Sequence, residues 1–278
     1  PAYVSGLKSG KINGKARPVI SKLTPSVVKA DGKNSLAPMV LKYGIPELVK
    51  AAKENGVAVL AITNSHHMAA MWPETEAIAE QGLVAFACTS YKPAVAPAGA
   101  IKPLFGTNPI CFGSPSGSKV PFILDTSISM INRGKIRLAA RHNKKIPEGV
   151  ALDNKGKPTT DPRKALNGVQ LPIAGFRGSG LAWMVDILTG VFVGSNHGGK
   201  VKDPFDDFSG PQNIGHLFLA FKDNLFVKDY KKEIKEKLIK LTQDAFDKKI
   251  FGAPTFICND KIFWGQDRLD YAIDECSS

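Results

Sequence analysis

The residues of this chain best suited to chemistry lie between Leu104 and Ile136. A glycine–proline loop, Gly106–Pro109, precedes an apolar stretch that ends in one acid, Asp125, and the acid leads into the hydroxyl-rich turn Thr126–Ser129. A carboxylate at the end of a buried strand, beside backbone N–H groups and hydroxyls, is a common way to build a ligand site. An ordinary strand end followed by a turn would carry the same residues, so the local pattern leaves both interpretations open.

A pair of histidines, His66 and His67, is the second candidate for chemistry. A metal site is disfavoured, because adjacent residues on a strand point apart and no carboxylate or further histidine lies at ligand spacing. A single histidine that moves a proton or hydrogen-bonds a carbonyl fits better, and a buried structural histidine is the alternative. His216, at the head of an apolar run, is expected to be a hydrogen-bonded structural residue.

The standard nucleotide and hydrolase fingerprints are missing from the sequence. The segment Gly175–Gly180 places three glycines and one arginine before an apolar helix, which could bring N–H groups and a positive charge to a phosphate. It does not match GxGxxG after a strand or GxxxxGK[ST], and no GxSxG occurs. A dinucleotide, if it binds, therefore does not use a standard Rossmann turn.

Two helix–strand units position these residues. We expect a helix from Pro46 to Gly56, a buried strand over 57–62, a helix over 73–82 and a strand over 83–88, with polar residues after each strand. In open α/β sheets ligands bind at the carboxyl ends of the strands. Residues 1–44 are read as short strands and loops. A helix is expected at 181–193, a strand at 215–221, an amphipathic helix at 231–248, and a strand pair with a helix after residue 251.

The composition is that of an ordinary globular protein, with 43% hydrophobic and 22% charged residues in 278. No apolar run is long enough to span a bilayer, and the first residues do not resemble a signal peptide. Because the chain does not begin with Met, we expect it to start inside a longer gene product. The net charge of +12 comes from dispersed lysines without interleaved aromatics, which argues against nucleic acid. The four cysteines lack CxxC spacing and predict buried thiols in a cytoplasmic protein.

Several short motifs together resemble one family. In order they are Asn64–His67, Pro97–Gly99, Leu104–Ile110, Leu124–Asp125, Arg133–Ile136, Ile146–Gly149, Thr159–Pro162 and Gly178–Leu181. Over roughly residues 1–228 the chain resembles the type-2 malate/L-lactate dehydrogenases, which include ureidoglycolate, sulfolactate and diketogulonate oxidoreductases. The resemblance implies an α/β fold with a non-Rossmann, mixed-sheet NAD(P)-binding domain, a homodimer, and hydride transfer to or from a small 2-hydroxy or 2-oxo acid of the malate or lactate type.

The same resemblance assigns roles to residues. His67 and Asp125 would be catalytic, and Ser65 and Tyr91 would face the substrate. The NAD or NADP cofactor would contact Thr107, Asn108, Pro109, Asp125, Thr126, Ser127, Arg177 and Gly178. Arg133, Arg137 and Arg141 could bind a carboxylate or lie on an exposed face.

The chain departs from the family pattern at several positions. Met68–Ala69 replace the usual Phe-Gly, Tyr91 stands where a smaller serine is typical, and Arg177 replaces a lysine. The upstream Ser-His-Gly…Arg motif, whose histidine is taken as the proton donor, is absent, and we expect the N-terminal helices to be missing with it. Only His67 is then placed to offer a proton. The competing hypothesis is a non-catalytic family member that acts as a binding or partner subunit.

The C-terminal stretch looks different. We divide the chain into a dehydrogenase-like domain over 1–230, with its cofactor region at about 60–195, and a tail over 231–278, with a junction in 228–245. Residues 251–269 resemble the 2-hydroxychromene-2-carboxylate isomerase and kappa-class glutathione transferase group, a thioredoxin-like fold. That resemblance implies that Pro254 and Thr255 meet glutathione and that Asp267–Arg268 hold the next helix, which gives a third hypothesis, a glutathione-dependent isomerase. Alternatively, Gly265–Gln266 replace a family cofactor contact.

Overall fold

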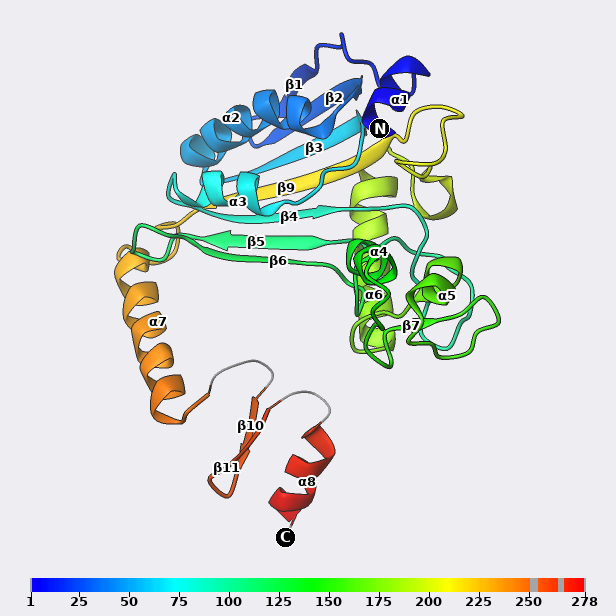
Figure 1. The fold of residues 1–278 in the computed structure, drawn as a ribbon. Coiled ribbons are helices and arrows are strands. Elements are labelled where there is room, and N and C mark those ends of the chain that lie inside the picture. The colour runs from blue at the N-terminus through cyan, green and yellow to red at the C-terminus, as the bar shows by residue number, and fades with distance from the viewer. Residues whose placement is uncertain (1, 251–254, 265–267, 278) are drawn as a thin grey trace. The chain divides into compact units, whose positions relative to one another are not determined.

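A seven-stranded mixed sheet organises the larger part of the chain (Figure 1). The computed structural model describes residues 2–250, 255–264 and 268–277. Their contacts separate two units, residues 1–115 with 120–228, and residues 116–119 with 229–278. Within the sheet the strands run in the order β1 (Val19–Thr24), β2 (Val27–Ser35), β3 (Val57–Ser65), β9 (Ile214–Lys222), β4 (Leu83–Thr89), β5 (Ile110–Ser114) and β6 (Phe122–Thr126).

The strand directions confirm the expected mixed sheet. Only β2 and β3 pair in parallel, and every other neighbouring pair is antiparallel. The apolar run at the start of β3 is buried on both faces, as its composition predicts. Ala58, Leu60 and Ile62 belong to the core on one face, whereas Val59 and Ala61 pack into the core on the other. This alternation is the two-residue period of a strand.

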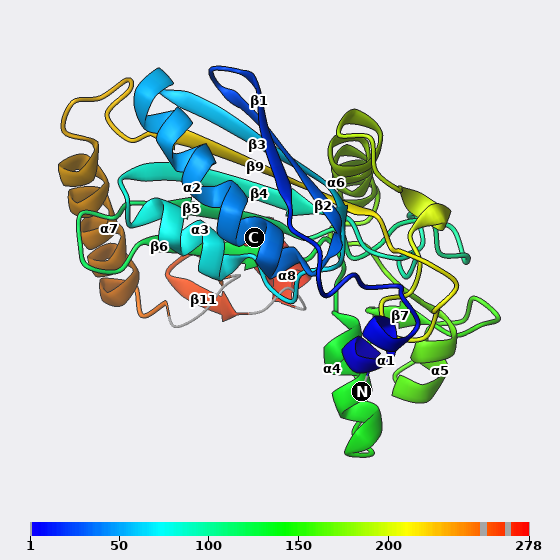
Figure 2. The same cartoon turned by 90° about the horizontal axis from the view of Figure 1, so that it is seen from above.

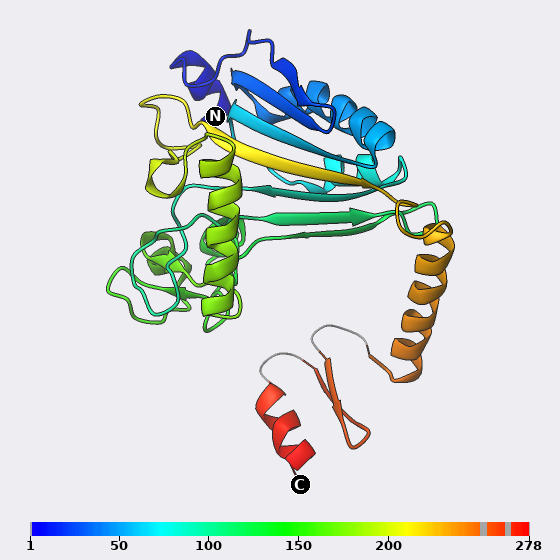
Figure 3. The same cartoon turned by 180° about the vertical axis from the view of Figure 1, so that it is seen from behind.

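Helices cover both faces of this sheet. Helix α2 (Ala37–Asn55) and helix α3 (Trp72–Ala79) supply Leu48 and Ile78 to one core, and α6 (Phe176–Asp186) supplies Val185 to the other. Figures 1 and 3, seen from opposite sides, show α2 and α3 over one face and α6 over the other. A π-helix, η1 (Ile187–Phe192), extends α6, so the helix expected at 181–193 begins earlier than predicted.

The prediction for the first 56 residues was partly wrong. Helix α2 begins at Ala37 with a proline in its first turn, so Pro46 lies inside the helix and not at its start. An internal proline removes one backbone hydrogen bond but does not prevent the helix from continuing. The predicted end is confirmed, because Gly56 follows the helix with φ of 85°. A short helix, α1 (Ala2–Lys8), also lies in the stretch read as strands and loops.

A smaller cluster lies beyond one end of the sheet (Figures 1 and 2). It contains α4 (Arg133–Arg141), β7 (Ala151–Leu152), α5 (Pro162–Asn167) and β8 (Val169–Gln170). Of these elements, α4, β7 and α5 share a third apolar core. Ile136 is fully buried in that core. The 3₁₀ helix η2 (Gly198–Lys200) lies in the long loop before β9. No helix of the described residues is both long and apolar enough to cross a membrane.

The second unit contains α7 (Tyr230–Asp247), the hairpin β10 (Thr255–Cys258) and β11 (Lys261–Trp264), and α8 (Leu269–Ser277). The amphipathic helix and the strand pair followed by a helix are therefore confirmed. The prediction of four thiols was wrong, because a disulfide joins Cys258 to Cys276, with 5.6 Å between their Cα atoms. Cys88 and Cys111 are buried free thiols, as expected. Cysteine usage thus no longer argues for one compartment.

Candidate active site

The strand order brings the predicted polar segments to one edge of the sheet. Strands β3 and β4 are both antiparallel to β9, so they run in the same direction. Strand β6 also runs this way, because β5 lies antiparallel between β4 and β6. The carboxyl ends of β3, β4 and β6 therefore share an edge with the first residues of β5 and β9. This edge is where the sequence predicted a ligand site.

A pocket of about 490 Å³ opens at this edge, within the range typical of small-molecule sites. Its walls come from the turn after β3, the end of β4, the loop before β5, the end of β6, the start of α4, and one residue of the loop before β9. Among the predicted site residues it is lined by His67, Tyr91, Thr107, Pro109, Asp125, Thr126 and Ser127. These predicted residues come together from four separate segments of the chain, which makes an accidental cluster of polar groups a poor explanation.

Aromatic side chains surround His67 in this pocket. Its ring stacks on Tyr3 at 5.7 Å between centroids and meets Phe205 edge-on at 5.2 Å. Nε2 lies 3.2 Å from the Tyr3 hydroxyl, whereas Nδ1 is buried with no partner in the protein. Burial lowers the pKa of His67 to about 4, and the charges of His66 and Lys11 act in the same direction. The imidazole is therefore neutral near pH 7.

The two neighbouring histidines have structural surroundings. His66 is buried with Nε2 3.0 Å from the carbonyl oxygen of Lys11. His216 is fully buried, and its Nε2 lies 3.1 Å from the carbonyl oxygen of His66. These bonds link β9, the turn after β3 and the segment before β1. The structural prediction for His216 is confirmed, and of the adjacent pair it is His67 that faces the pocket.

Asp125 acts as a helix cap. Its Oδ2 accepts hydrogen bonds from the backbone N–H groups of Met71, at 2.9 Å, and Trp72, at 3.0 Å. These are unpaired donors at the start of α3, and a carboxylate there is stabilised by the helix dipole. Asp125 therefore holds the Met68–Met71 wall of the pocket in place, a role that the sequence interpretation did not include.

The loop before β5 is fixed from behind the pocket. Asn108 is fully buried with φ of 38°, and its side chain accepts a bond from the Tyr91 N–H and donates to the Ala182 carbonyl and Asp186. A Cβ at Gly106 would lie 2.3 Å from the Tyr91 carbonyl oxygen, so only glycine fits. Asn108 thus shapes the loop that presents Thr107 and Pro109, and its own side chain points away from the pocket.

Three further predicted site residues do not line the pocket. Ser65 is fully buried at the end of β3, and its hydroxyl donates to the His66 carbonyl at 3.3 Å. Arg177 is exposed, with its guanidinium over the Phe176 ring. Gly178 is buried at the start of α6, where a Cβ would meet the Ile173 carbonyl oxygen. The side chain of Ser65 points away from the pocket because side chains alternate between the two faces of a strand. Arg177 and Gly178 lie on α6, which contributes no residue to the pocket.

The pocket also contains residues to which the sequence analysis assigned no definite role. Ser90 is 2% exposed, lines the pocket and has a buried Oγ with no partner. Arg133 and Arg137 line the wall formed by α4, and Phe205 comes from the loop before β9. A polar residue after an apolar strand was a usable signal for Ser90. Phe205 had no such signal, because it lies in a long loop.

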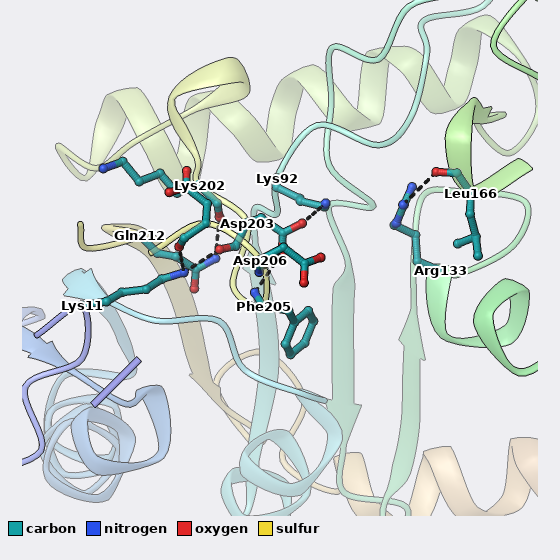
Figure 4. Close-up of polar contacts among 10 residues, drawn as sticks. Lys11, Lys92, Arg133, Leu166, Lys202, Asp203, Phe205, Asp206 and Gln212 are labelled. Atoms are coloured by element: carbon teal, nitrogen blue, oxygen red, sulfur yellow. Dashed lines mark hydrogen bonds and ion pairs between the residues drawn. The ribbon is translucent and has the colours of Figure 1, made fainter. Parts of the chain in front are cut away.

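That loop is anchored by two lysines (Figure 4). Lys11 is 1% exposed, and its Nζ donates to the backbone carbonyls of Asp203 and Asp207. Burial lowers the pKa of this lysine, Lys11. The second lysine, Lys92, forms an ion pair with the Asp203 carboxylate. Since the carboxylate of Asp203 also accepts the Phe205 N–H at 2.8 Å, the two lysines hold Phe205 against His67.

Comparison with known proteins decides the family. Residues 1–249 match the malate/L-lactate dehydrogenase family. The chain belongs to this family. The match runs past the junction expected in 228–245, and the isomerase resemblance of the tail finds no support. Of the residues on which that resemblance rested, 251–254 (with Pro254) and 265–267 (Gly265, Gln266 and Asp267) lie outside the described residues.

Individual relatives agree with this assignment. A Delta(1)-pyrroline-2-carboxylate reductase of Ancylobacter novellus is 41% identical over 224 residues, which are 81% of this chain and 66% of that protein. A (2R)-3-sulfolactate dehydrogenase (NADP(+)) of Chromohalobacter salexigens is 36% identical over 84% of this chain and 70% of that protein. The crystal structure of delta1-piperideine-2-carboxylate reductase from Pseudomonas syringae pvar. tomato superposes with a TM-score of 0.80 and 36% identity, covering 88% of this chain and 74% of the other. The chain thus spans about two thirds of the length of the first of these relatives.

The residues at the pocket fit a nicotinamide cofactor. The hydroxyls of Thr107, Thr126 and Ser127 offer hydrogen bonds to a carboxamide or ribose, and His67 Nδ1 and Ser90 Oγ are buried polar atoms without a protein partner. Such orphaned atoms are rare in native structures and are expected where a ligand completes the hydrogen bonding. The missing GxGxxG is consistent with a sheet that is not a Rossmann sheet.

Proposed function

We propose that this chain provides the site of an NAD(P)-dependent oxidoreductase that reduces a small acid at C2, the carbon next to its carboxylate. The observation that carries the proposal is the pocket at the carboxyl ends of β3, β4 and β6, which is lined by seven residues assigned beforehand to the catalytic, substrate and cofactor sites: His67, Tyr91, Thr107, Pro109, Asp125, Thr126 and Ser127. Membership of the malate/L-lactate dehydrogenase family supports it.

In this proposal the cofactor is NAD or NADP, and it supplies the hydride when bound. Thr107, Pro109, Thr126 and Ser127 hold its nicotinamide end. Asp125 remains in the cofactor site, but it acts through the α3 cap that fixes the neighbouring wall and does not transfer a proton. Arg177 and Gly178 lie outside the pocket and would contact a part of the cofactor further from the nicotinamide.

The protonation state of His67 favours one class of substrate. Reduction of a 2-oxo acid leaves charge on oxygen, so a general acid must supply a proton. With a pKa of about 4, His67 is neutral near pH 7 and is a poor acid. A protonated cyclic imine differs, because hydride addition to its C2 neutralises the C=N–H⁺ group and gives the amine without a further proton. Two of the three relatives compared above are named as reductases of cyclic imino acids.

The role of His67 is then to orient the substrate. If Nε2–H donates to the Tyr3 hydroxyl, Nδ1 keeps a lone pair that can accept a hydrogen bond from the imine N–H. Tyr91 and Phe205 provide apolar surface for a small ring, and both lie within 6.3 Å of the imidazole between ring centroids. We therefore place a cyclic 2-imino acid first and a malate- or lactate-type 2-oxo acid second.

The test is oxidation of NADH and NADPH with Δ1-pyrroline-2-carboxylate, pyruvate and oxaloacetate, by wild type and by His67→Ala. We expect turnover with the cyclic imine and a large loss in the variant. Turnover with the oxo acids alone would favour the second substrate class. If NADH binds measurably but no substrate is turned over, the chain is not an active oxidoreductase. That result would favour the hypothesis of a non-catalytic binding or partner subunit.

We also propose that the chain forms a homodimer, as the family resemblance implies. Helices α6 and η1 together expose several large apolar side chains, with relative exposures of 74% for Phe176, 51% for Ile187, 62% for Val191 and 73% for Phe192. Large apolar side chains exposed in number on neighbouring elements are typical of protein interfaces. Sedimentation should show a dimer in wild type and a monomer in Val191→Asp. A monomeric wild type would contradict the proposal.

A further inference from the structure

Two arginines form one wall of the pocket. Arg133 and Arg137 lie four residues apart on α4, so their side chains share one face of the helix. Both line the pocket, whereas Arg141, one turn further along, does not. An arginine pair facing into a cavity is a common arrangement for binding an oxoanion, since each guanidinium offers several donors in a fixed plane.

The hydrogen bonding of Arg133 is incomplete. One terminal nitrogen donates to the Leu166 carbonyl oxygen at 3.1 Å, which fixes the side chain, as Figure 4 shows. Its Nε is buried and has no partner in the protein. Leaving a buried N–H of a charged group unpaired is costly, so a ligand that accepts from it would be stabilised.

The charge around the pair is also unbalanced. Burial lowers the pKa of Arg133, and the positive charge of Arg137 acts in the same direction. The Arg137 guanidinium lies 5.2 Å from the centroid of the Phe205 ring. Two acids, Asp203 and Asp206, oppose this effect through their charges, and Asp203 is already paired with Lys92. The carboxylate that lines the pocket itself, Asp125, is bound to the start of α3.

We infer that Arg133 and Arg137 form an oxoanion subsite that binds an acid group of the ligand, either the carboxylate or sulfonate of the substrate or a phosphate of the cofactor. An anion placed between the two guanidinium groups satisfies Arg133 Nε and offsets the repulsion between the two positive charges. The naming of the ligand rests on the proposed function, but the subsite itself rests on the pocket and its two arginines.

Direct binding measurements test the subsite. Isothermal titration calorimetry measures the affinities of malonate, inorganic phosphate and NADH. The proteins compared are wild type, Arg137→Gln, Arg137→Lys and the matched control Arg141→Gln. Arg137 is exposed, so its replacement should leave the fold intact, which a thermal melt verifies. We expect Arg137→Gln to weaken at least one probe about tenfold or more, Arg137→Lys to weaken it less, and Arg141→Gln to bind like wild type.

The probes separate the two sources of the anion. A loss for malonate assigns the subsite to an acid group of the substrate, and a loss for NADH and phosphate assigns it to the cofactor. Equal affinities of Arg137→Gln and wild type for all probes, or no binding of any probe, would overturn the inference. If malonate or phosphate binds through Arg137 but no NAD(P)H-dependent turnover is found, the proposed function fails and the subsite stands.

Discussion

The two sides of the turn that follows β3 use buried polar groups in different ways. On one side Lys11, His66 and His216 each bond a backbone carbonyl, and together they tie β9 and the loop before it to the turn. On the pocket side His67 Nδ1 and Ser90 Oγ are buried without a partner in the protein. The first arrangement stabilises the fold, whereas the second leaves hydrogen bonds for a ligand to complete.

Two histidines of the chain, His67 and His216, show that the role of a histidine cannot be inferred from its protonation state alone. Burial lowers the pKa of both His67 and His216 to about 4, so the two rings are in the same protonation state near pH 7. They differ in what surrounds them, since His216 is fully buried in the sheet and His67 lines the pocket. We therefore expect substitutions on the first side to change stability and substitutions on the pocket side to change binding and turnover.

The largest expected effect is a loss of stability in acid. His216 binds its proton at about pH 4 in the folded state and near its ordinary 6.5 when unfolded, so the unfolded chain holds more protons between these values. The free energy of unfolding should therefore fall as the pH drops from about 6.5 to 4, by at most about 3 kcal/mol for this histidine. Urea unfolding at several pH values should show a weaker acid dependence in His216→Leu than in wild type. The exposed His142→Leu serves as control, and an unchanged slope in His216→Leu would contradict the account.

A slightly smaller effect is expected at the lysine that anchors the loop before β9. Lys11→Met removes charge-assisted bonds to the carbonyls of Asp203 and Asp207 and should lower the free energy of unfolding by about 2 kcal/mol. It should also weaken turnover, because the loop carries Phe205. The exposed Lys15→Met provides the matched control in chemical denaturation. Equal stability of the two variants would show that the buried lysine is not an anchor.

On the pocket side the expected effect concerns activity. His67→Gln should reduce kcat/KM about 100-fold, equivalent to about 2.7 kcal/mol, while the free energy of unfolding changes by less than about 1 kcal/mol. Steady-state kinetics and urea melts on the same preparation measure both quantities. If His67→Gln unfolded as easily as His216→Leu but kept its turnover, His67 would stabilise the fold and would not serve catalysis, which contradicts the expected difference between the two sides.

The smallest effect is expected at the helix cap. Asp125→Ala should cost about 1 kcal/mol of stability, because two N–H groups at the start of α3 lose their acceptor. Asp161→Ala removes a similar cap from α5, away from the pocket, and should destabilise comparably without affecting NADH affinity. In Asp125→Asn, turnover should persist. Its complete loss would mean that Asp125 takes part in proton transfer.

Much of the fold could be predicted from local patterns. The apolar runs of β3, β4 and β9 fixed their positions, and polar residues after β3 and β4 identified the edge that carries the pocket. The insertion of β9 between these two strands could not be inferred, because pairing between strands distant in sequence leaves no local signal. The start of α2 was also misplaced, since a proline fits the first turn of a helix better than its interior and Pro46 is interior.

The candidate site was recovered in part for similar reasons. Motif residues on strand ends, such as His67 and Thr126, line the pocket because strand direction places them there. The side-chain directions of Ser65 and Asn108 depend on packing against other elements, which the motif does not encode. The two arginines of α4 were left undecided between a carboxylate site and an exposed face, because only the packing of Ile136 in its core determines which face of α4 turns toward the pocket.

The central claim is hydride transfer within this pocket, and isotope transfer tests it most directly. The protein is incubated with Δ1-pyrroline-2-carboxylate and with NADH or NADPH that carries deuterium at nicotinamide C4, and the product is analysed by mass spectrometry and NMR. The account predicts one deuterium at C2 of the resulting cyclic amino acid, with formation of the labelled product strongly reduced in His67→Gln. The account would be contradicted if the product carried no deuterium with cofactor labelled at either of the two C4 positions. It would also be contradicted if wild type and His67→Gln formed labelled product at equal rates.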